Sequence, residues 1–129
     1  MNDALIWVIE DNDQNFELVD YLLTEAGHRV ARARDLEEVE RLAAGDTPNL
    51  VLLDMNLPTG SGLELIARLR AIAGAREAPI VALTAHAMRG DRERFLAAGC
   101  DGYISKPIET RPFLDAVERF LEPPAGSDR

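Results

Sequence analysis

Residues 50–54 read Leu-Val-Leu-Leu-Asp, a short run of consecutive apolar residues that ends in a carboxylate. A strand with one solvated face alternates apolar and polar residues, whereas a parallel strand covered on both faces is apolar throughout. The runs at 5–9 and 80–83 have the same apolar character, and weaker runs of similar length occupy 29–33 and 102–105. The sequence therefore predicts five short strands, with 50–53 and its two strongest counterparts buried inside a parallel sheet.

Segments with helical spacing separate the predicted strands. Apolar residues recur three and four positions apart within 16–26, 36–43, 65–72 and 113–121, and a less apolar segment at 89–98 is interpreted as a more exposed helix. Strands and helices that alternate in this way favour one α/β domain, with helices on both faces of a parallel sheet.

The predicted helix ends carry recognisable capping residues. Asp35 and Glu38 fit an N-terminal cap and its partner at the start of the second helix. Glycine can adopt the left-handed conformation that closes a helix, and an Ala-Gly pair ends four of the helical stripes. These glycines are Gly27, Gly45, Gly74 and Gly99.

The length and composition restrict the class of protein. The 129 residues suit a single domain, expected over residues 1–122, with 123–129 as a short flexible tail. A net charge of -9 argues against a nucleic-acid partner, and no apolar run is long enough to span a membrane. A single cysteine, Cys100, is typical of a reducing cytoplasm, where we expect the protein to act. Thirteen of the 14 basic residues are arginine, and Lys106 is the only lysine.

Polar residues follow four of the predicted strands. They are Glu10, Asp11, Asp54, Thr84 and Lys106. The carboxyl ends of parallel strands share one edge of a sheet, where open α/β sheets bind their ligands. Three crowded carboxylates repel one another, and Mg²⁺ with its preference for oxygen ligands would relieve that repulsion. An aspartate can attack phosphorus, while a lysine and a hydroxyl stabilise the transferred phosphoryl group. The set therefore predicts Mg²⁺-dependent phosphoryl transfer.

Each of these residues also has an ordinary structural interpretation. A Glu-Asp pair after a strand is favoured by the dipole of the helix that follows. Asp54 can begin a turn, Thr84 can simply end a strand, and Lys106 can be a solvated lysine. All of them together at one sheet edge are much harder to explain by chance, and we favour the functional interpretation.

Residues 4–122 resemble a response-regulator receiver domain of two-component signalling. The resemblance rests on Ile9–Asn12, Leu52–Pro58 with Gly62, Ile80–Ala85 and Gly102–Pro107. It implies a flavodoxin-like (βα)5 three-layer sandwich whose five parallel strands have the order 2-1-3-4-5.

The resemblance also implies a role for each site residue. Asp54 would accept the phosphoryl group, and Mg²⁺ would be held by Asp11, Asp54, the main-chain carbonyl of Asn56 and, directly or through water, Glu10. Lys106 would pair with the phosphoryl group, and Thr84 would hydrogen-bond it.

Further positions would serve switching and the lifetime of the phosphate. Tyr103 would rotate inward behind Thr84, although an ordinary half-buried aromatic remains an alternative. The small residue Ala85 would leave room for the phosphoryl group, and Pro107 would follow a cis peptide bond. Asn56 and His86 would flank the hydrolytic water, although His86 could equally be a solvated histidine.

We therefore expect a signalling phosphoacceptor rather than an enzyme. The donor would be a histidine kinase or a histidine phosphotransfer protein, and a downstream protein would bind the face made by the fourth helix, fifth strand and fifth helix. The receiver could be a single-domain regulator or phosphorelay intermediate, or a domain excised from a hybrid histidine kinase. A haloacid-dehalogenase-type phosphatase is a weaker alternative, because Asn56 replaces that family's second aspartate. A domain that has lost phosphorylation is disfavoured by the complete acidic, Thr and Lys set.

Overall fold

One parallel sheet forms the centre of the protein. The computed structural model describes residues 4–55, 62–72, 78–84, 93, 97 and 99–121. The strand order is β2-β1-β3-β4-β5, which confirms the expected 2-1-3-4-5 topology. The strands are β1 (Leu5–Ile9), β2 (Arg29–Ala33), β3 (Leu50–Asp54), β4 (Ile80–Thr84) and β5 (Gly102–Ser105).

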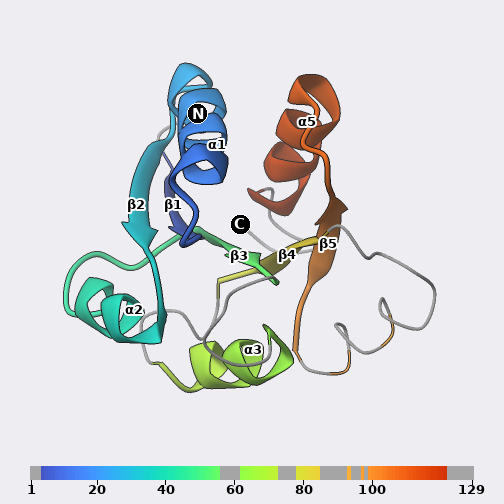
Figure 1. Ribbon diagram of the computed structural model, residues 1–129. Coiled ribbons are helices and arrows are strands. Elements are labelled where there is room, and N and C mark those ends of the chain that lie inside the picture. The colour runs from blue at the N-terminus through green and yellow to red at the C-terminus, as the bar shows by residue number, and fades with distance from the viewer. Residues whose placement is uncertain are drawn as a thin grey trace, which may run out of the picture.

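Helices cover both faces of this sheet and complete the three-layer sandwich. On one face lie α1 (Asp13–Glu25) and α5 (Thr110–Leu121), and on the other lie α2 (Leu36–Leu42) and α3 (Gly62–Ala71) (Figure 1). Alternate residues of a strand point to opposite faces, so the core has two halves. Ile6 and Val8 of β1 belong to the half that includes α1 and α5, while Trp7 and Ile9 belong to the other.

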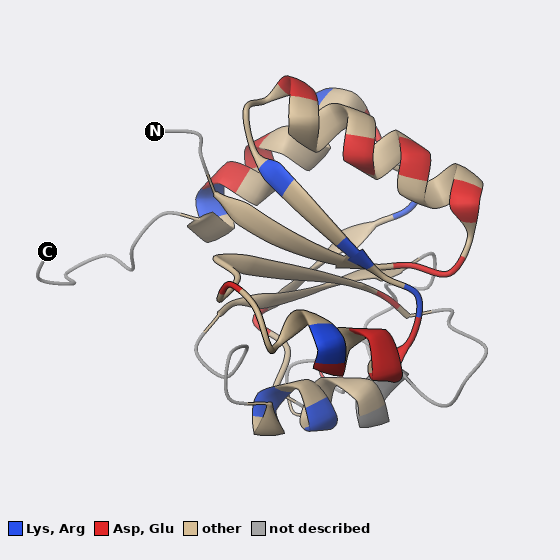
Figure 2. Cartoon of the chain, turned by 90° about the vertical axis from the view of Figure 1, so that its left-hand side faces the viewer, with Lys and Arg blue, Asp and Glu red and all other residues tan. Residues whose placement is uncertain are grey.

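The position of each strand in the sheet explains its composition. Every residue of β1, β3 and β4 is buried, as their consecutive apolar residues predict. The edge strands β2 and β5 are mostly half-exposed and accommodate polar residues. At the β2 edge, arginine bands lie below the acidic bands of α1 (Figure 2). Trp7 is accommodated within the buried core and is 1% exposed.

Local hydrogen bonds define the ends of the helices. Asn12 caps α1, because its Oδ1 accepts a hydrogen bond from the Asn15 N–H at 2.9 Å. Asp35 caps α2 in the same way through the Glu38 N–H, at 3.0 Å. The Glu38 carboxylate accepts instead from the Arg34 N–H, one residue before the cap, so the predicted pair is not a reciprocal capping box.

The glycines that follow the helices differ in conformation. Gly27 and Gly99 have φ of 97° and 112°, in the left-handed region expected of helix-closing glycines. Gly45 does not have a positive φ, because α2 ends in a right-handed turn in which the Gly45 N–H donates to the Leu42 carbonyl.

Several predicted features lie outside the described residues. They are Gly74, Asn56, Ala85, His86, the tail at 123–129 and, apart from residues 93 and 97, the helix predicted at 89–98. Over the ranges that are described, no helix is long and apolar enough to cross a membrane.

Candidate phosphoacceptor site

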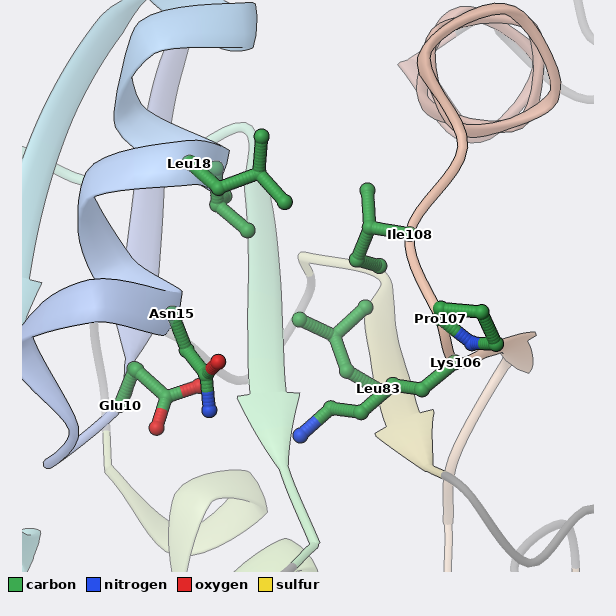
Figure 3. Close-up of a pocket in the computed structure, with 8 residues that line it drawn as sticks. Glu10, Asn15, Leu18, Leu83, Lys106, Pro107 and Ile108 are labelled. Atoms are coloured by element: carbon green, nitrogen blue, oxygen red, sulfur yellow. The ribbon is translucent and has the colours of Figure 1, made fainter.

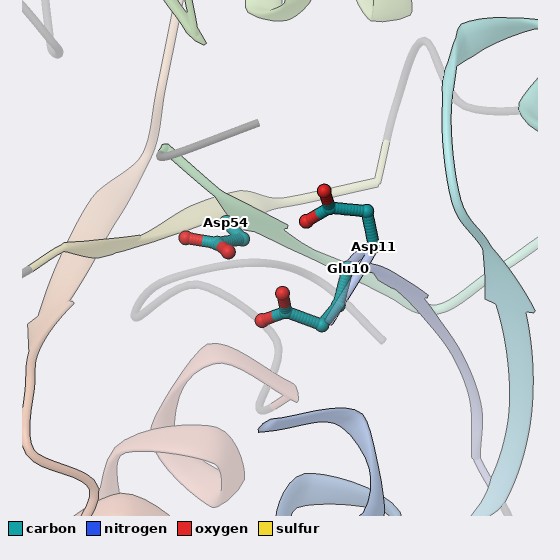
Figure 4. A group of neighbouring side chains, drawn as sticks. All are labelled: Glu10, Asp11 and Asp54. Atoms are coloured by element: carbon teal, nitrogen blue, oxygen red, sulfur yellow. The ribbon is translucent and has the colours of Figure 1, made fainter. Parts of the chain in front are cut away.

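Three carboxylates meet at the carboxyl edge of the central strands. Glu10 and Asp11 directly follow β1, and Asp54 ends β3, the strand that pairs with β1. Their side chains extend toward a shared space (Figure 4), and one oxygen of each lies within 4.8 Å of the others. Oxygen ligands from carboxylates suit Mg²⁺, so this donor set fits the cation that the sequence predicts.

Burial of Glu10 raises the pKa of its carboxyl group. The side chain is 1% exposed, and its Oε2 accepts a hydrogen bond from the Asn12 N–H at 3.1 Å. Burial raises the pKa of Glu10 from 4.5 to about 7, and its hydrogen bond with Asp54 acts in the same direction. A proton on Glu10 thus removes one of three adjacent negative charges when no cation is bound.

Lys106 supplies the opposite charge. Its Nζ donates to Oδ1 of Asp54 at 2.9 Å, and the Asp54 side chain is only 3% exposed. The backbone sets this position, because Ser105 of β5 pairs with Thr84 and the Lys106 N–H donates to the Thr84 carbonyl at 2.8 Å. The Lys106–Pro107 peptide bond is cis. The only lysine in the sequence therefore contacts the predicted nucleophile.

Thr84 and Tyr103 lie on the two neighbouring strands. Thr84 ends β4 and is buried. Thr84 directly follows Leu83, which pairs with Asp54 across the two strands. The Leu83 carbonyl accepts a hydrogen bond from the Met55 N–H. Tyr103 pairs with Ala82, is half-buried and packs against the half of the core that includes α3. Thr84 thus belongs to the same strand edge as Asp54, and Tyr103 lies further back along β5.

The structure brings together five of the predicted site residues, namely Glu10, Asp11, Asp54, Thr84 and Lys106. It also contains a contact to the acidic loop that sequence reasoning missed. Arg32 of β2 donates to the main-chain carbonyl of Glu10 and pairs with Asp13. The nearby guanidinium of Arg32 and the charge of Arg34 hold the pKa of Asp13 below its usual value. Arg32 belongs to no motif, and the only available signal was an arginine in the last half of an edge strand.

A pocket opens beside these residues, between α1 and the segment that follows β5 (Figure 3). Its volume is about 190 Å³. Glu10, Asn15 and Lys106 contribute polar groups, while the remaining wall is mostly apolar and is formed by Leu18, Val19, Leu83, Pro107 and Ile108. Leu18 is 43% exposed, and the nearby Tyr21 of α1 is 62% exposed. The charged site is therefore bordered by an accessible apolar surface.

Comparison with known proteins agrees with this fold. The family model of the response regulator receiver domain matches residues 6–118. The chain belongs to this family of signalling proteins. It is 38% identical over 116 residues to the polar-differentiation response regulator DivK of Brucella anthropi, a match that covers 90% of this chain and 94% of that protein.

Solved structures give the same result. The receiver domain of a sensor histidine kinase from Pseudomonas aeruginosa, crystallised with magnesium coordinated in its active site cleft, is 32% identical with a TM-score of 0.80. That match covers 92% of this chain and 98% of the other. The chemotaxis response regulator CheY4 of Vibrio cholerae, 24% identical with a TM-score of 0.84 and the same coverage, shares the fold. Receiver membership is thus supported by sequence and by structure, and it decides against a haloacid-dehalogenase-type phosphatase.

Proposed function

We propose that Asp54 accepts a phosphoryl group from a phosphohistidine and that this chain acts as a phosphorylated switch. The observation that supports Asp54 most directly is its ion pair with Lys106, at 2.9 Å, beside two further carboxylates. An Asp54 oxygen attacks phosphorus, and the bond from phosphorus to the donor's imidazole nitrogen breaks with its electron pair leaving on nitrogen. The products are an aspartyl-phosphate and an unmodified histidine.

The proposed Mg²⁺ ligands are Asp11, Asp54, Glu10 and the main-chain carbonyl of Asn56. Glu10 would act directly or through water. The first three supply carboxylates that lie within 4.8 Å of one another, which supports this choice. Bound Mg²⁺ would offset the charge of the carboxylates and of the phosphoryl oxygens. Ionisation of Glu10 favours binding, because a protonated carboxyl is a poor ligand for a hard cation.

Lys106 and Thr84 have separate roles in this proposal. The ammonium group pairs with phosphoryl oxygens as charge develops on them, and the Thr84 hydroxyl donates a hydrogen bond to one of them once the group is attached. The neighbouring Ala85 is proposed to leave room for the phosphoryl group. Movement of Thr84 toward that oxygen vacates space, into which Tyr103 turns. A local electrostatic change thereby selects between two packing arrangements of the surface near β5.

Loss of the phosphate is proposed to be a self-catalysed hydrolysis rather than turnover of an outside substrate. Water attacks phosphorus, the bond to the Asp54 oxygen breaks, and inorganic phosphate leaves while the carboxylate is regenerated. Asn56 and His86 are the proposed residues beside the attacking water, so exchanging His86 should change the dephosphorylation rate with little effect on Mg²⁺ affinity. An unchanged rate would assign His86 to the surface without a kinetic role.

The proposed donor is a histidine kinase or a histidine phosphotransfer protein that binds over α1. The pocket between α1 and the segment after β5 is lined by Glu10 and by Lys106, the partner of Asp54, which supports an approach of the phosphohistidine from this side. Leu18 lines this pocket, and Leu18 and Tyr21 are exposed on α1. The proposed downstream partner binds the separate face formed by the helix predicted at 89–98, by β5 and by α5. No nucleic acid is proposed as a partner, given the net charge of -9.

The proposed role in signalling is that of a single-domain regulator or a phosphorelay intermediate. The match to DivK of Brucella anthropi supports it, because the matched region makes up 94% of that protein. The alternative, a receiver excised from a hybrid kinase, has support from the similar receiver of the Pseudomonas aeruginosa sensor kinase. Phosphotransfer assays with single-domain and kinase-linked partners separate these two roles.

Intact-mass measurement after incubation with a small phosphodonor tests the assignment of Asp54. We expect one phosphate adduct with Mg²⁺, little without it, and none in Asp54→Asn. The matched control is Asp46→Asn. Asp46 is an exposed aspartate in the segment after α2, and its ion pair with Arg29 is long, at 3.9 Å. An adduct that survives in Asp54→Asn would overturn the assignment.

A further inference from the structure

Arg32 connects the edge strand β2 to the loop that carries the acidic ligands. Its Nε donates to the main-chain carbonyl of Glu10 at 3.1 Å, and its Nη2 lies 2.9 Å from Oδ1 of Asp13. Glu10 and Asp13 bracket Asp11, which contributes a carboxylate to the acidic cluster. One guanidinium therefore contacts the loop on both sides of that carboxylate.

The main chain strengthens this attachment. The Glu10 N–H donates to the Ala33 carbonyl at 2.9 Å, so both main-chain polar groups of Glu10 are bound to β2 or to its side chains. The guanidinium lies over the ring of Phe16, 4.5 Å from the ring centroid, and the Arg32 side chain is 18% exposed. A guanidinium held by a ring, a carbonyl and a carboxylate has little freedom to move.

We propose that Arg32 is a positioning residue for the divalent cation, which it aids by holding the Glu10–Asp13 loop so that Asp11 faces Asp54. The inference rests on the proposed Mg²⁺ site. Groups that orient metal ligands without touching the metal typically contribute 10–100-fold to affinity. Crowded carboxylates repel one another, and a loop without this restraint would relax outward before a cation binds. Arg32 opposes that relaxation through its geometry, and lysine lacks the planar fork that makes both contacts.

Arg34 provides a matched control. It carries the same charge, lies two residues away and pairs with the same Asp13 oxygen at 3.2 Å. Its other described interaction is through its main-chain N–H, which donates to Glu38 rather than to the ligand loop. Arg34→Gln thus removes an equal charge from the neighbourhood without releasing the Glu10 carbonyl.

The test is a Mg²⁺ titration of the full chain in which the NMR chemical shifts of the Asp11 and Asp54 amides report binding. Urea unfolding of the metal-free proteins measures stability in parallel. We expect Arg32→Gln to weaken Mg²⁺ binding about 10-fold or more and Arg32→Lys to weaken it several-fold. Arg34→Gln should stay within about two-fold of the wild type. If Arg32→Gln does not fold, the Mg²⁺ affinity of Arg32→Lys relative to the wild type decides whether Arg32 positions the metal ligands.

Other outcomes would overturn the proposal in distinguishable ways. Reduced unfolding free energy with unchanged Mg²⁺ affinity in both Arg32 variants would make Arg32 a purely structural residue. Equal weakening by Arg32→Gln and Arg34→Gln would assign the effect to positive charge or to the shared Asp13 contact, and would exclude a specific role for the bond from Arg32 to the Glu10 carbonyl. A wild-type protein that shows no Mg²⁺-dependent shift would overturn the metal site as well, whereas normal wild-type binding with unaffected variants would overturn only the role of Arg32.

Discussion

The ammonium group of Lys106 lies 2.9 Å from Oδ1 of Asp54, although the two residues are 52 positions apart in sequence. Each residue lies at the end of a strand, because Asp54 is the last residue of β3 and Lys106 comes directly after β5. Strand β4 lies between β3 and β5 and pairs with both strands. The register of these two pairings therefore places Asp54 and Lys106 at the same end of the sheet. The contact is thus a consequence of parallel pairing across three strands.

Removal of Lys106 should separate metal binding from phosphoryl transfer. We expect Lys106→Met to slow phosphorylation by a small phosphodonor on the order of 100-fold, because it removes a charge that stabilises the transition state. Mg²⁺ affinity should remain the same or increase, since Asp54 loses a competing cation. Rates followed by intact mass, with Mg²⁺ binding measured in parallel, check both parts. Loss of Mg²⁺ binding in Lys106→Met would contradict the proposed division of roles.

Glu10 should make the metal-free protein less stable as the pH rises. Its pKa is about 7 in the folded protein against an ordinary value of 4.5, so between these values the folded state holds more protons than the unfolded state. The contribution to stability is present below about pH 4.5 and is lost as the pH rises through 7. We expect the wild type to lose on the order of 1–3 kcal/mol relative to Glu10→Gln over this range.

Urea unfolding in EDTA at a series of pH values measures this difference. Comparison with Glu10→Gln cancels the titration of groups remote from Glu10, because both proteins contain them. Parallel stability curves for the two proteins would show that Glu10 does not retain a proton in the folded state. Mg²⁺ added above pH 7 should restore the stability of the wild type more than that of the variant, because cation binding favours the folded state.

A charge placed in the exposed surface of α1 should impair only the protein donor. Leu18 lines the pocket and is 43% exposed, so Leu18→Glu should change the free energy of unfolding by less than about 1 kcal/mol. We expect transfer from a phosphorylated histidine protein to fall about 10-fold or more, and phosphorylation by a small phosphodonor to stay unchanged. Arg41→Gln on α2, which alters the net charge equally on the opposite face, is the control. Equal loss with both donors would argue against a docking surface on α1.

A side chain at Gly102 should destabilise the fold. A Cβ at this position would overlap the ring of Phe120 in α5, whereas a Cβ at Gly45 would lie 3.6 Å from the Leu42 carbonyl oxygen in ordinary contact. We expect Gly102→Ala to cost about 1–3 kcal/mol of unfolding free energy and Gly45→Ala to cost less than about 1 kcal/mol.

Denaturant unfolding and a double variant check the cause. Phe120→Leu shortens the side chain that meets the new methyl group, so Gly102→Ala should be less costly in that background. Costs that simply add in the double variant would locate the effect elsewhere in β5.

Much of the architecture was predictable because burial on both faces produces a distinctive sequence. The predicted strands at 5–9, 29–33 and 102–105 agree with the structure, and the predicted runs at 50–53 and 80–83 each extend by one polar residue. Those extra residues, Asp54 and Thr84, belong to the ladder as well as to the site. Apolar periodicity locates a strand but does not mark where its pairing stops.

His28 illustrates what periodicity does not reveal. Its sequence context is a turn before a strand, and it suggested no role. In the structure it is buried, and its Nε2 lies 2.8 Å from Oε2 of Glu118 in α5, 90 residues away. The contact depends on how α5 packs beside α1 on the same face of the sheet, and no local pattern encodes that packing.

The sequence by itself determined the parallel α/β class, the strand positions and the set of acidic, hydroxyl and lysine residues at one edge. These features follow from hydrophobic patterning and from the shared direction of parallel strands, which are both local properties repeated along the chain. Only the tertiary structure decided that Lys106 contacts Asp54, that Glu10 shares a buried space with Asp54, and that Arg32 reaches the Glu10 carbonyl. These contacts join different strands, so they depend on strand order, register and side-chain conformation, which are set when the sheet assembles as a whole.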